Sequence, residues 1–189
     1  MNRFALFACA ATVTLPAIPA GAAPTTYTLV AAQSRLQFTG TQAGAPFTAQ
    51  FHRFGATIVF AADDLAKSHF DVRIDMKSAD SKDKDRDGTM QGSDIFDVAK
   101  WPTAEYTTGS FTRAGTAGYR ATGMLTLRGV SRAVPITFNF AATPTGAVLT
   151  GAATLERLDF GVGQGDWKST EWVGNDVKIA FTLVLVPKR

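Results

Sequence analysis

The sequence predicts an all-β fold, a closed antiparallel barrel or a sandwich, and three observations carry this prediction. Apolar and polar residues alternate at period two, as in residues 70–76, which read Phe-Asp-Val-Arg-Ile-Asp-Met; this pattern marks strands with one buried face. Short segments rich in Gly and Thr, such as 114–118 and 143–146, separate these runs as hairpin turns do. The pattern also recurs often enough for about eight or nine strands.

The strands are expected at regular intervals along the chain. The same alternation runs through residues 119–128, 134–140 and 177–185, and further strands are expected at 26–30, 35–42, 45–61, 103–113 and 147–160. Only residues 82–100 break the rhythm. There an Asp/Lys run followed by spaced apolar residues predicts one or two helical turns packed on the sheet and ended by Pro102.

Eight or nine antiparallel strands are too many for an open sheet to remain flat, because strand twist accumulates. Closure removes the exposed edges, and an eight-stranded barrel has an interior just wide enough for side chains or one small ligand. The apolar faces would line that interior.

Residues 1–22 are expected to be a cleaved secretory signal, which leaves one domain over residues 23–189. Asn2 and Arg3 give a short polar start, an apolar stretch follows, and Ala20-Gly21-Ala22 offers small residues for cleavage. The single cysteine, Cys9, lies within this segment. We therefore expect a periplasmic or secreted protein without disulfides.

The charge balance does not indicate a nucleic-acid partner. Of the 189 residues, 19 are Lys or Arg and 16 are Asp or Glu, and no basic block accompanies the net charge of +3.

The predicted interior is either a filled core or an apolar tunnel, and both alternatives stay open. The inward positions are rich in Phe and aliphatic residues, which fill cores in most barrels. Small inward residues would instead leave unfilled width; they are Ala49, Ala104, Ala121, Gly123, Gly151 and Ala153. A tunnel would suit an extended lipid, since each buried methylene contributes about 0.8 kcal/mol.

The sequence offers little for catalysis or metal binding. His52 and His69 are both expected on outward faces, no hydrolase or zinc motif occurs, and only Asp159 and Glu105 are loose candidates for an acid or base. Residues 83–94 have the spacing of a calcium loop, but a strand precedes them and Asp94 replaces the usual Glu. The alternative is a solvated turn that caps a short helix.

Three segments resemble the YceI-like family of exported lipid-binding proteins. They are residues 27–38; residues 94–106, which read Asp-Ile-Phe-Asp-Val-Ala-Lys-Trp-Pro-Thr-Ala-Glu-Tyr; and residues 123–136, with Gly-Met-Leu-Thr-Leu-Arg-Gly-Val-Ser-Arg. Arg128 and Ile95 depart from the family's more common His and Phe. The resemblance implies a lipocalin-like, extended eight-stranded antiparallel barrel with a short helical element over it. It also implies an apolar tunnel for a long polyisoprenoid.

Residues 157–167 resemble the branch of that family associated with cytochrome b561, so a membrane cytochrome of that type is an expected partner. The three glycines of this segment allow a tight turn, and Trp167 and Trp172 would either form a lip at the barrel mouth or cover the core edge. A homodimer is an alternative assembly.

The function expected from these observations is non-catalytic binding of an isoprenoid lipid or isoprenoid quinone, for carriage, storage or stress protection. No cofactor or metal is expected. The expected ligand-binding residues are Phe38, Phe47, Phe51, Phe70, Ile74, Met90, Phe96, Trp101, Tyr106, Leu125, Leu127, Phe138, Phe181 and Leu183. A polar head group would meet Arg35, Tyr119 or the Trp residues. The alternatives are a structural or stress-response interaction module with a filled barrel, a lipid-modifying enzyme on the same barrel, and an outer-membrane barrel with its apolar faces outward.

Overall fold

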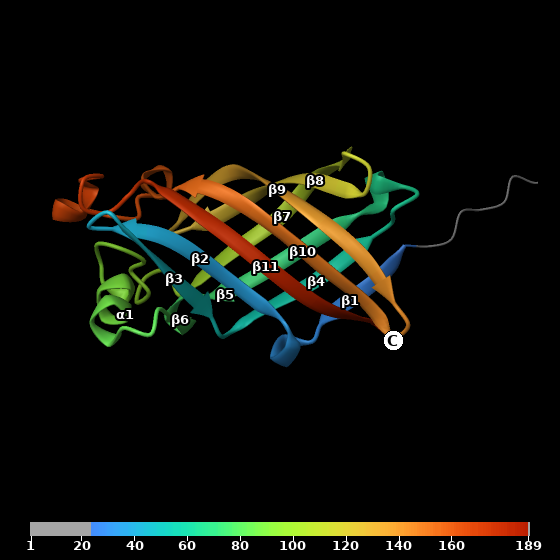
Figure 1. Ribbon diagram of the computed structural model, residues 1–189, viewed down its shortest axis with the longest axis horizontal. Helices are drawn as coiled ribbons and strands as arrows, with labels where there is room; N and C mark the ends of the chain where they lie inside the picture. Colours follow the sequence, from blue (N-terminus) through green and yellow to red (C-terminus); the bar gives the residue numbers. More distant parts are fainter. Residues whose placement is uncertain (1–23, 189) are drawn as a thin grey trace, which may run out of the picture.

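The computed structural model describes residues 24–188 and consists of one sheet rolled into a barrel (Figure 1). The predicted signal segment, residues 1–22, lies outside the described residues. The strands are β1 (Thr25–Leu29), β2 (Arg35–Gln42), β3 (Ala45–Phe51), β4 (Phe54–Phe60), β5 (His69–Asp75), β6 (Ala79–Asp80), β7 (Thr103–Ala114), β8 (Gly118–Leu127), β9 (Val130–Thr143), β10 (Gly146–Glu156) and β11 (Asp176–Pro187).

Eight of these strands close the antiparallel barrel. They follow the order β1, β4, β5, β7, β8, β9, β10 and β11, and β11 returns to pair with β1. The lipocalin-like barrel predicted from the sequence is thus confirmed. The one α-helix of the described chain, α1 (Lys84–Gln91), lies at one end of the barrel, and the C-terminus lies at the other (Figure 1).

Strand β11 closes the barrel by pairing with two successive strands. Its C-terminal part pairs with β1, with Leu29 opposite Leu185, and its N-terminal part pairs with β2, with Leu36 opposite Phe181. Where the partner changes, the Ser34 hydroxyl accepts a hydrogen bond from the Val184 N–H at 2.9 Å. This bond satisfies a backbone donor that the break in the ladder would otherwise leave unpaired.

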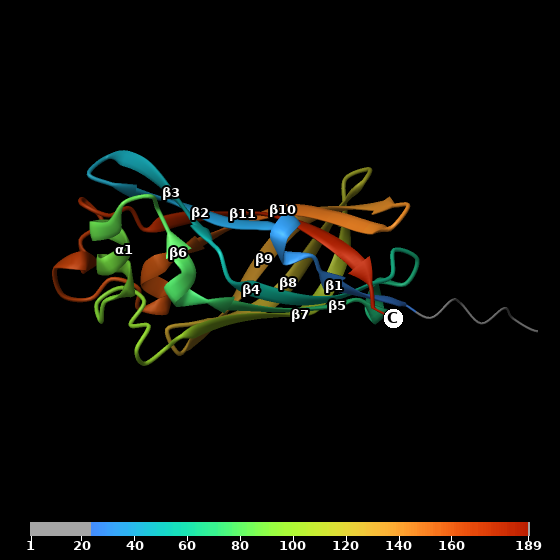
Figure 2. The ribbon, with the colours of Figure 1, turned by 90° about the horizontal axis from the view of Figure 1, so that it is seen from below.

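At the α1 end the sheet continues away from the barrel. Strand β2 pairs with β3, and β3 pairs with the short β6. At this end β2 and β3 are separated from β4 and β5, as Figure 2 shows. The barrel is therefore tightly closed near the C-terminus and splayed near α1.

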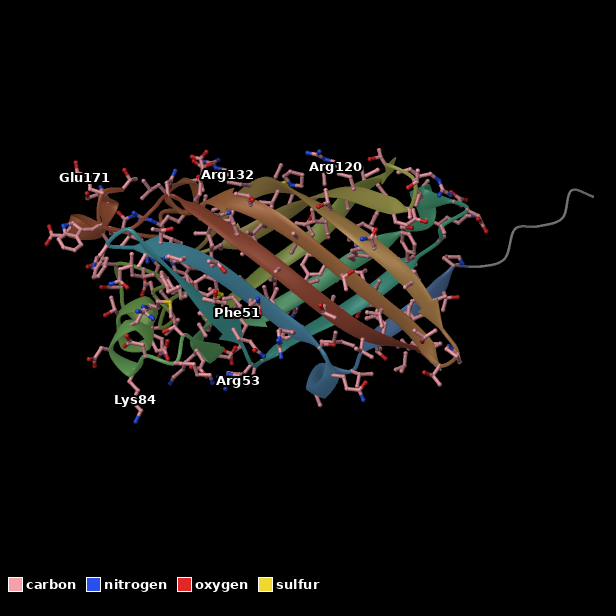
Figure 3. All side chains as sticks on the ribbon, viewed as in Figure 1. Phe51, Arg53, Lys84, Arg120, Arg132 and Glu171 are labelled. Carbon is pink, nitrogen blue, oxygen red and sulfur yellow. The ribbon has the colours of Figure 1, made fainter. Side chains whose placement is uncertain are left out.

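The inward faces are apolar and the outward faces polar, as the alternation predicts. On β8, Tyr119, Ala121, Leu125 and Leu127 are buried, whereas Arg120 between them is exposed and points to solvent in Figure 3. This arrangement is the reverse of the one expected for an outer-membrane barrel. Within the described residues, no helix is long and apolar enough to cross a bilayer.

The prediction of a single strand over residues 45–61 is wrong, because the chain bends at residues 52–53 and forms two strands, β3 and β4. At the bend, the Arg53 N–H donates to the Ser78 hydroxyl at 3.0 Å, and the Arg53 guanidinium contacts the Asp75 carboxylate at 2.8 Å. Strand β3 pairs with β2 while β4 pairs with β1, so the bend lets one run of chain change partners. His52 accordingly lies in this bend and not within a strand.

The strand expected over residues 147–160 also ends earlier, at Glu156. Residues Arg157–Phe160 form a 3-10 helix that Gly161 terminates in the left-handed region, with φ of 66°. The helix predicted within residues 82–100 is confirmed as α1, but it ends at Gln91 and not at Pro102, and turns follow it.

The acidic segment caps the start of α1, as the second interpretation of residues 83–94 predicts. The Asp83 carboxylate accepts hydrogen bonds from the backbone N–H groups of Asp85 and Arg86, both at 3.1 Å, and Asp87 accepts from the Ser81 N–H at 2.8 Å. These bonds satisfy free donors at the helix start. Across residues 24–188 no cluster of His, Cys, Asp or Glu has the arrangement of a metal site.

Two of the small inward residues make room for aromatic rings, which corrects the expectation that they leave space empty. A Cβ atom at Gly123 would lie 2.6 Å from Cζ of Tyr106, and one at Gly151 would lie 2.5 Å from Cζ of Phe181. The rings of neighbouring strands therefore occupy the volume above both glycines.

Replacing Gly123 by Ala is expected to lower the free energy of unfolding by about 1–3 kcal/mol, because the new methyl group overpacks against Tyr106 and the Thr107 carbonyl. Chemical denaturation measures this change. Gly109→Ala on the neighbouring β7 is the matched control, since its methyl group meets nothing closer than 3.6 Å. Equal effects of the two substitutions would contradict the packing role of Gly123.

Candidate functional site

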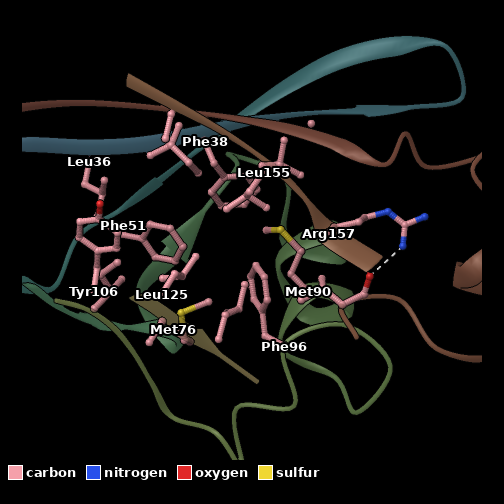
Figure 4. Close-up of a pocket in the computed structure, with 18 of the residues that line it drawn as sticks. Leu36, Phe38, Phe51, Met76, Met90, Phe96, Tyr106, Leu125, Leu155 and Arg157 are labelled. Atoms are coloured by element: carbon pink, nitrogen blue, oxygen red, sulfur yellow. Dashed lines mark hydrogen bonds between the residues drawn. The ribbon is translucent and has the colours of Figure 1, made fainter. Parts of the chain in front are cut away.

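The candidate site is a cavity of about 440 Å³ inside the half of the barrel nearest α1 (Figure 4). This volume falls within the range of small-molecule binding sites, about 300–1,000 Å³. Its walls come from the inward residues of the strands, together with α1 and the segment after β10.

The wall is assembled from residues that alternation places on the inner face. Among them are Leu36 and Phe38 on β2, Phe51 on β3, Tyr106 on β7, Leu125 on β8 and Leu155 on β10, all labelled in Figure 4. Further wall residues are Ile58, Phe70, Val72, Ile74, Leu127, Val134, Ile136, Leu149, Ala153, Val177, Ile179, Phe181 and Leu183. The lining is almost entirely hydrocarbon, which suits an apolar ligand.

The other half of the interior is filled by aromatic side chains, which we call the aromatic plug. It comprises Phe60, Phe70, Phe111, Tyr119, Phe138 and Phe140, of which only Phe70 also lines the cavity. The ring centroids of Tyr119 and Phe138 lie 5.4 Å apart and stacked, and those of Phe60 and Tyr119 lie 4.8 Å apart. The two alternatives left open by the sequence, a filled core and an apolar tunnel, therefore each describe one half of the same barrel.

The mouth of the cavity is covered by α1 and the turns that follow it. Met90, near the end of α1, and Phe96 are both buried and point inward (Figure 4). The Phe96 ring meets the Phe38 ring edge-on at 6.2 Å. The guanidinium of Arg128 holds the covering turn by donating to the carbonyls of Ser93 at 2.6 Å and Ile95 at 3.2 Å.

Polar groups gather at the mouth around Arg86 of α1. Its guanidinium donates to the side-chain oxygen of Gln42 at 3.1 Å and lies 4.7 Å from the centre of the Phe47 ring. It also lies 3.4 Å from the Asp83 carboxylate. These contacts tie the covering helix to the splayed strands β2 and β3.

Arg157 is a buried cation that sequence reasoning missed. Its guanidinium donates to the carbonyls of Val162 at 2.8 Å, Val173 at 2.8 Å and Gly174 at 3.0 Å, and a fourth bond reaches Ser169. Burial lowers the pKa of Arg157 from its usual value. The alternation could have indicated its burial, because residue 157 is odd-numbered like the inward residues of β10. The side chain holds the segment that frames one side of the mouth.

Tyr106 places a hydroxyl within the apolar wall. This group donates to the Val134 carbonyl at 2.9 Å, and burial raises the pKa of Tyr106 well above its ordinary value. The phenol therefore stays protonated near neutral pH and contributes no charge to the cavity.

The structure places all but two of the expected ligand-binding residues in the cavity lining. Trp101 lies outside it, with its ring against the backbone of Gly129, and Phe138 belongs to the aromatic plug. Ligand contact by the others stays a prediction. The unpredicted lining residues include Leu36, Ile58, Met76, Leu155 and Arg157.

Two of the residues expected near a head group lie far from the mouth. Arg35 is exposed on the outer face of β2, and Tyr119 is buried in the aromatic plug. Trp167 does line the cavity mouth, whereas Trp172 is 67% exposed. A head group held at the mouth would therefore meet Trp167, Arg86 and Gln42 and not Arg35 or Tyr119.

The loose candidates for an acid or base do not reach the cavity. Glu105 is exposed and lies 3.4 Å from Arg73, and Asp159 is exposed on the 3-10 helix. His69 pairs with Asp71 at 2.8 Å on the outer face. Asp83 and Asp85, the acidic residues of the described lining, lie at the mouth on the helix start.

A closed eight-stranded barrel with a polar exterior and an apolar, one-ended cavity defines a lipocalin-like ligand-binding architecture. The chain belongs to the YceI-like family, since the YceI-like domain model matches residues 27–185. A UPF0312 protein of Shewanella denitrificans is 28% identical over 138 residues, covering 69% of this chain and 72% of that protein. A UPF0312 protein of Vibrio vulnificus is 29% identical over 119 residues, covering 60% of this chain and 63% of the relative.

Solved structures share the fold. BcnA of Burkholderia cenocepacia is 29% identical, with a TM-score of 0.79, over 82% of this chain and 98% of that one. A domain from Saccharophagus degradans, described as polyisoprenoid binding and implicated in plant cell wall breakdown, has a TM-score of 0.66 at 17% identity. The match covers 87% of this chain and 99% of that domain.

Replacing Arg157 by Met is expected to lower the free energy of unfolding by about 3 kcal/mol, because buried carbonyl groups lose their donors. Thermal and chemical denaturation measure the effect. Arg132→Met is the control, because Arg132 is exposed on β9 (Figure 3) and should change stability by less than about 0.5 kcal/mol. Wild-type stability of Arg157→Met would contradict the role of Arg157 in holding the mouth segment.

Proposed function

We propose that this protein is an exported, non-catalytic binding protein that holds an isoprenoid lipid, or the tail of an isoprenoid quinone, for carriage, storage or stress protection. The observation that carries the proposal is the apolar cavity of about 440 Å³, sealed at its inner end and framed by polar groups at its mouth. Such a cavity matches an amphiphile that buries its tail and leaves its head group near water.

The chemistry of the lining favours branched hydrocarbon over a polar ligand. Aliphatic and aromatic side chains from nine strands surround the space, and the Tyr106 hydroxyl already donates to a backbone carbonyl. A polar ligand placed there would lose its hydrogen bonds to water, and the apolar wall offers no hydrogen bonds that would compensate for this cost in free energy. The description of the Saccharophagus domain as polyisoprenoid binding agrees with this ligand class.

The non-catalytic part of the proposal follows from where the ionisable groups lie. Asp83, Asp85 and Arg86 are at the mouth, and Arg157 is occupied by backbone carbonyls. A reaction deep in the cavity would need an acid or base within hydrogen-bond reach of the tail. The residues described there supply only the phenol of Tyr106.

Export, the quinone head group and the cytochrome b561-type partner belong to the same proposal. They are supported by the signal-like residues 1–22 and by the resemblance of residues 157–167. Protein recovered from a periplasmic extract should have the mass of the chain without the signal segment. Loaded with ubiquinone, it should release quinone faster to vesicles containing a b561-type cytochrome than to vesicles without one.

The decisive experiment is native mass spectrometry of the protein purified from its exporting host without detergent, followed by organic extraction. We expect a discrete additional mass that the extract identifies as an isoprenoid. If the protein carries no lipid and binds no added prenol or ubiquinone, of short or long tail, the proposal is wrong and a structural or interaction role replaces it.

Substitution of Leu125 by Arg should abolish lipid loading, because a guanidinium in the cavity wall is incompatible with a hydrocarbon tail. Met124→Arg is the matched control: Met124 is the next residue on β8, faces outward and is 47% exposed. Circular dichroism reports whether each variant folds. Should Leu125→Arg unfold, Leu125→Trp fills the cavity without adding charge and should reduce loading in the same way. A folded Leu125→Arg protein that still carries lipid would contradict the placement of the ligand.

A further inference from the structure

The cavity ends at a defined level inside the barrel. On β9, the inward residues Val134 and Ile136 line the cavity, and the next inward residue, Phe138, does not. On β11, Leu183 lines the cavity and Leu185 does not. The cavity therefore ends between Ile136 and Phe138 on β9 and between Leu183 and Leu185 on β11, and aromatic rings lie beyond it on β9.

Phe138 is the centre of the structure beyond that level. It is 3% exposed, and its ring centroid lies 5.2 Å from that of Phe70, 5.4 Å from that of Tyr119, 5.7 Å from that of Phe60 and 6.2 Å from that of Phe111. Phe70 is itself part of the cavity wall. The ring of Phe138 thus directly supports the floor of the cavity.

The depth available to a ligand follows from the strand geometry. Val177 lies in the cavity wall near the mouth and Leu183 lies at the floor, both on β11. Six residues of strand rise about 20 Å. With the usual tilt of barrel strands, this corresponds to about 15 Å along the barrel axis.

A floor at a fixed depth makes affinity depend on tail length. Each methylene group buried in the cavity raises affinity about fourfold, so tails gain affinity until they reach the floor. A longer tail must leave carbons in water at the mouth, fold back in the same volume or displace packed rings. Each of these costs free energy that a tail ending at the floor avoids, because the extra carbons of a longer tail are buried when that tail lies in a lipid phase instead.

We propose that the aromatic plug, with Phe138 at its centre, sets the maximum tail length, so that this protein selects short isoprenoid tails over long ones. The inference rests on the proposed function, because it concerns the same cavity and the same ligand class. It assigns Phe138 a role in specificity, in place of the wall contact expected from the sequence.

The test is competition among prenols that differ only in tail length. The wild-type protein is stripped of lipid and offered equal amounts of farnesol, geranylgeraniol and solanesol, and native mass spectrometry measures the bound fraction of each. We expect wild-type protein to exclude solanesol in favour of the shorter prenols. Phe138→Ala should deepen the cavity and raise the preference for longer over shorter prenols about fifteenfold for every two carbon groups newly buried.

Leu185→Ala is the control. Leu185 is 1% exposed and lies one inward position beyond Leu183 on β11. It pairs with Leu29 and Ala147, and none of these three residues lines the cavity. Its truncation removes buried volume beyond the floor and leaves the ring of Phe138 in place, so the tail-length preference should stay as in the wild type.

A variant with the opposite effect keeps the proposal testable if Phe138→Ala fails to fold. Ile136→Phe places a ring in the cavity just above the floor and should shift preference toward farnesol. Two results would overturn the role of the plug and leave the proposed function standing. One is equal binding of all three prenols by the wild-type protein. The other is wild-type tail-length preference in a folded variant at position 138 or 136. Failure of the wild type to bind any prenol or ubiquinone would instead overturn the proposed function.

Discussion

The closure of the sheet by β11 is the constraint on which the rest of the structure depends. Because β11 pairs with β1 over its C-terminal part and with β2 over its N-terminal part, one end of the barrel is fully closed and the other is splayed. A closed end brings the inward side chains close enough to fill the interior. A splayed end separates them, and the space that results needs a separate cover, which α1 and residues 157–175 provide.

The division into plug and cavity follows from that closure. In the closed half, Phe60, Tyr119 and Phe138 pack ring against ring and supply the dense core that a barrel needs for stability. In the splayed half, residues of similar chemistry, such as Phe51 and Leu125, border the cavity. An apolar cavity costs stability, and a tail that fills it restores the lost contacts, so ligand binding and stability are linked.

The mouth has a different chemistry from the interior. Arg86 joins the covering helix to Gln42 and Phe47, and Arg157 organises the opposite side through backbone carbonyls. Both guanidinium groups therefore lie at the mouth, and neither places a charge deep within the cavity. A tail can therefore enter an uncharged space while its head group stays near charged and polar side chains, which is the distribution that an amphiphile requires.

The sequence by itself determined the fold class, the face that each strand turns inward and the apolar character of the interior, because side chains alternate along any strand whatever its partners. Only the tertiary structure decided where along those inward stripes the cavity ends. Leu125 and Phe138 have equivalent places in the alternation, yet one borders the cavity and the other fills the plug. The bend after Phe51 and the burial of Arg157 were likewise decided by pairing partners distant in sequence. Alternation specifies which side chains point into the barrel. The depth of the cavity depends on how far apart the closed sheet holds opposite walls of the barrel.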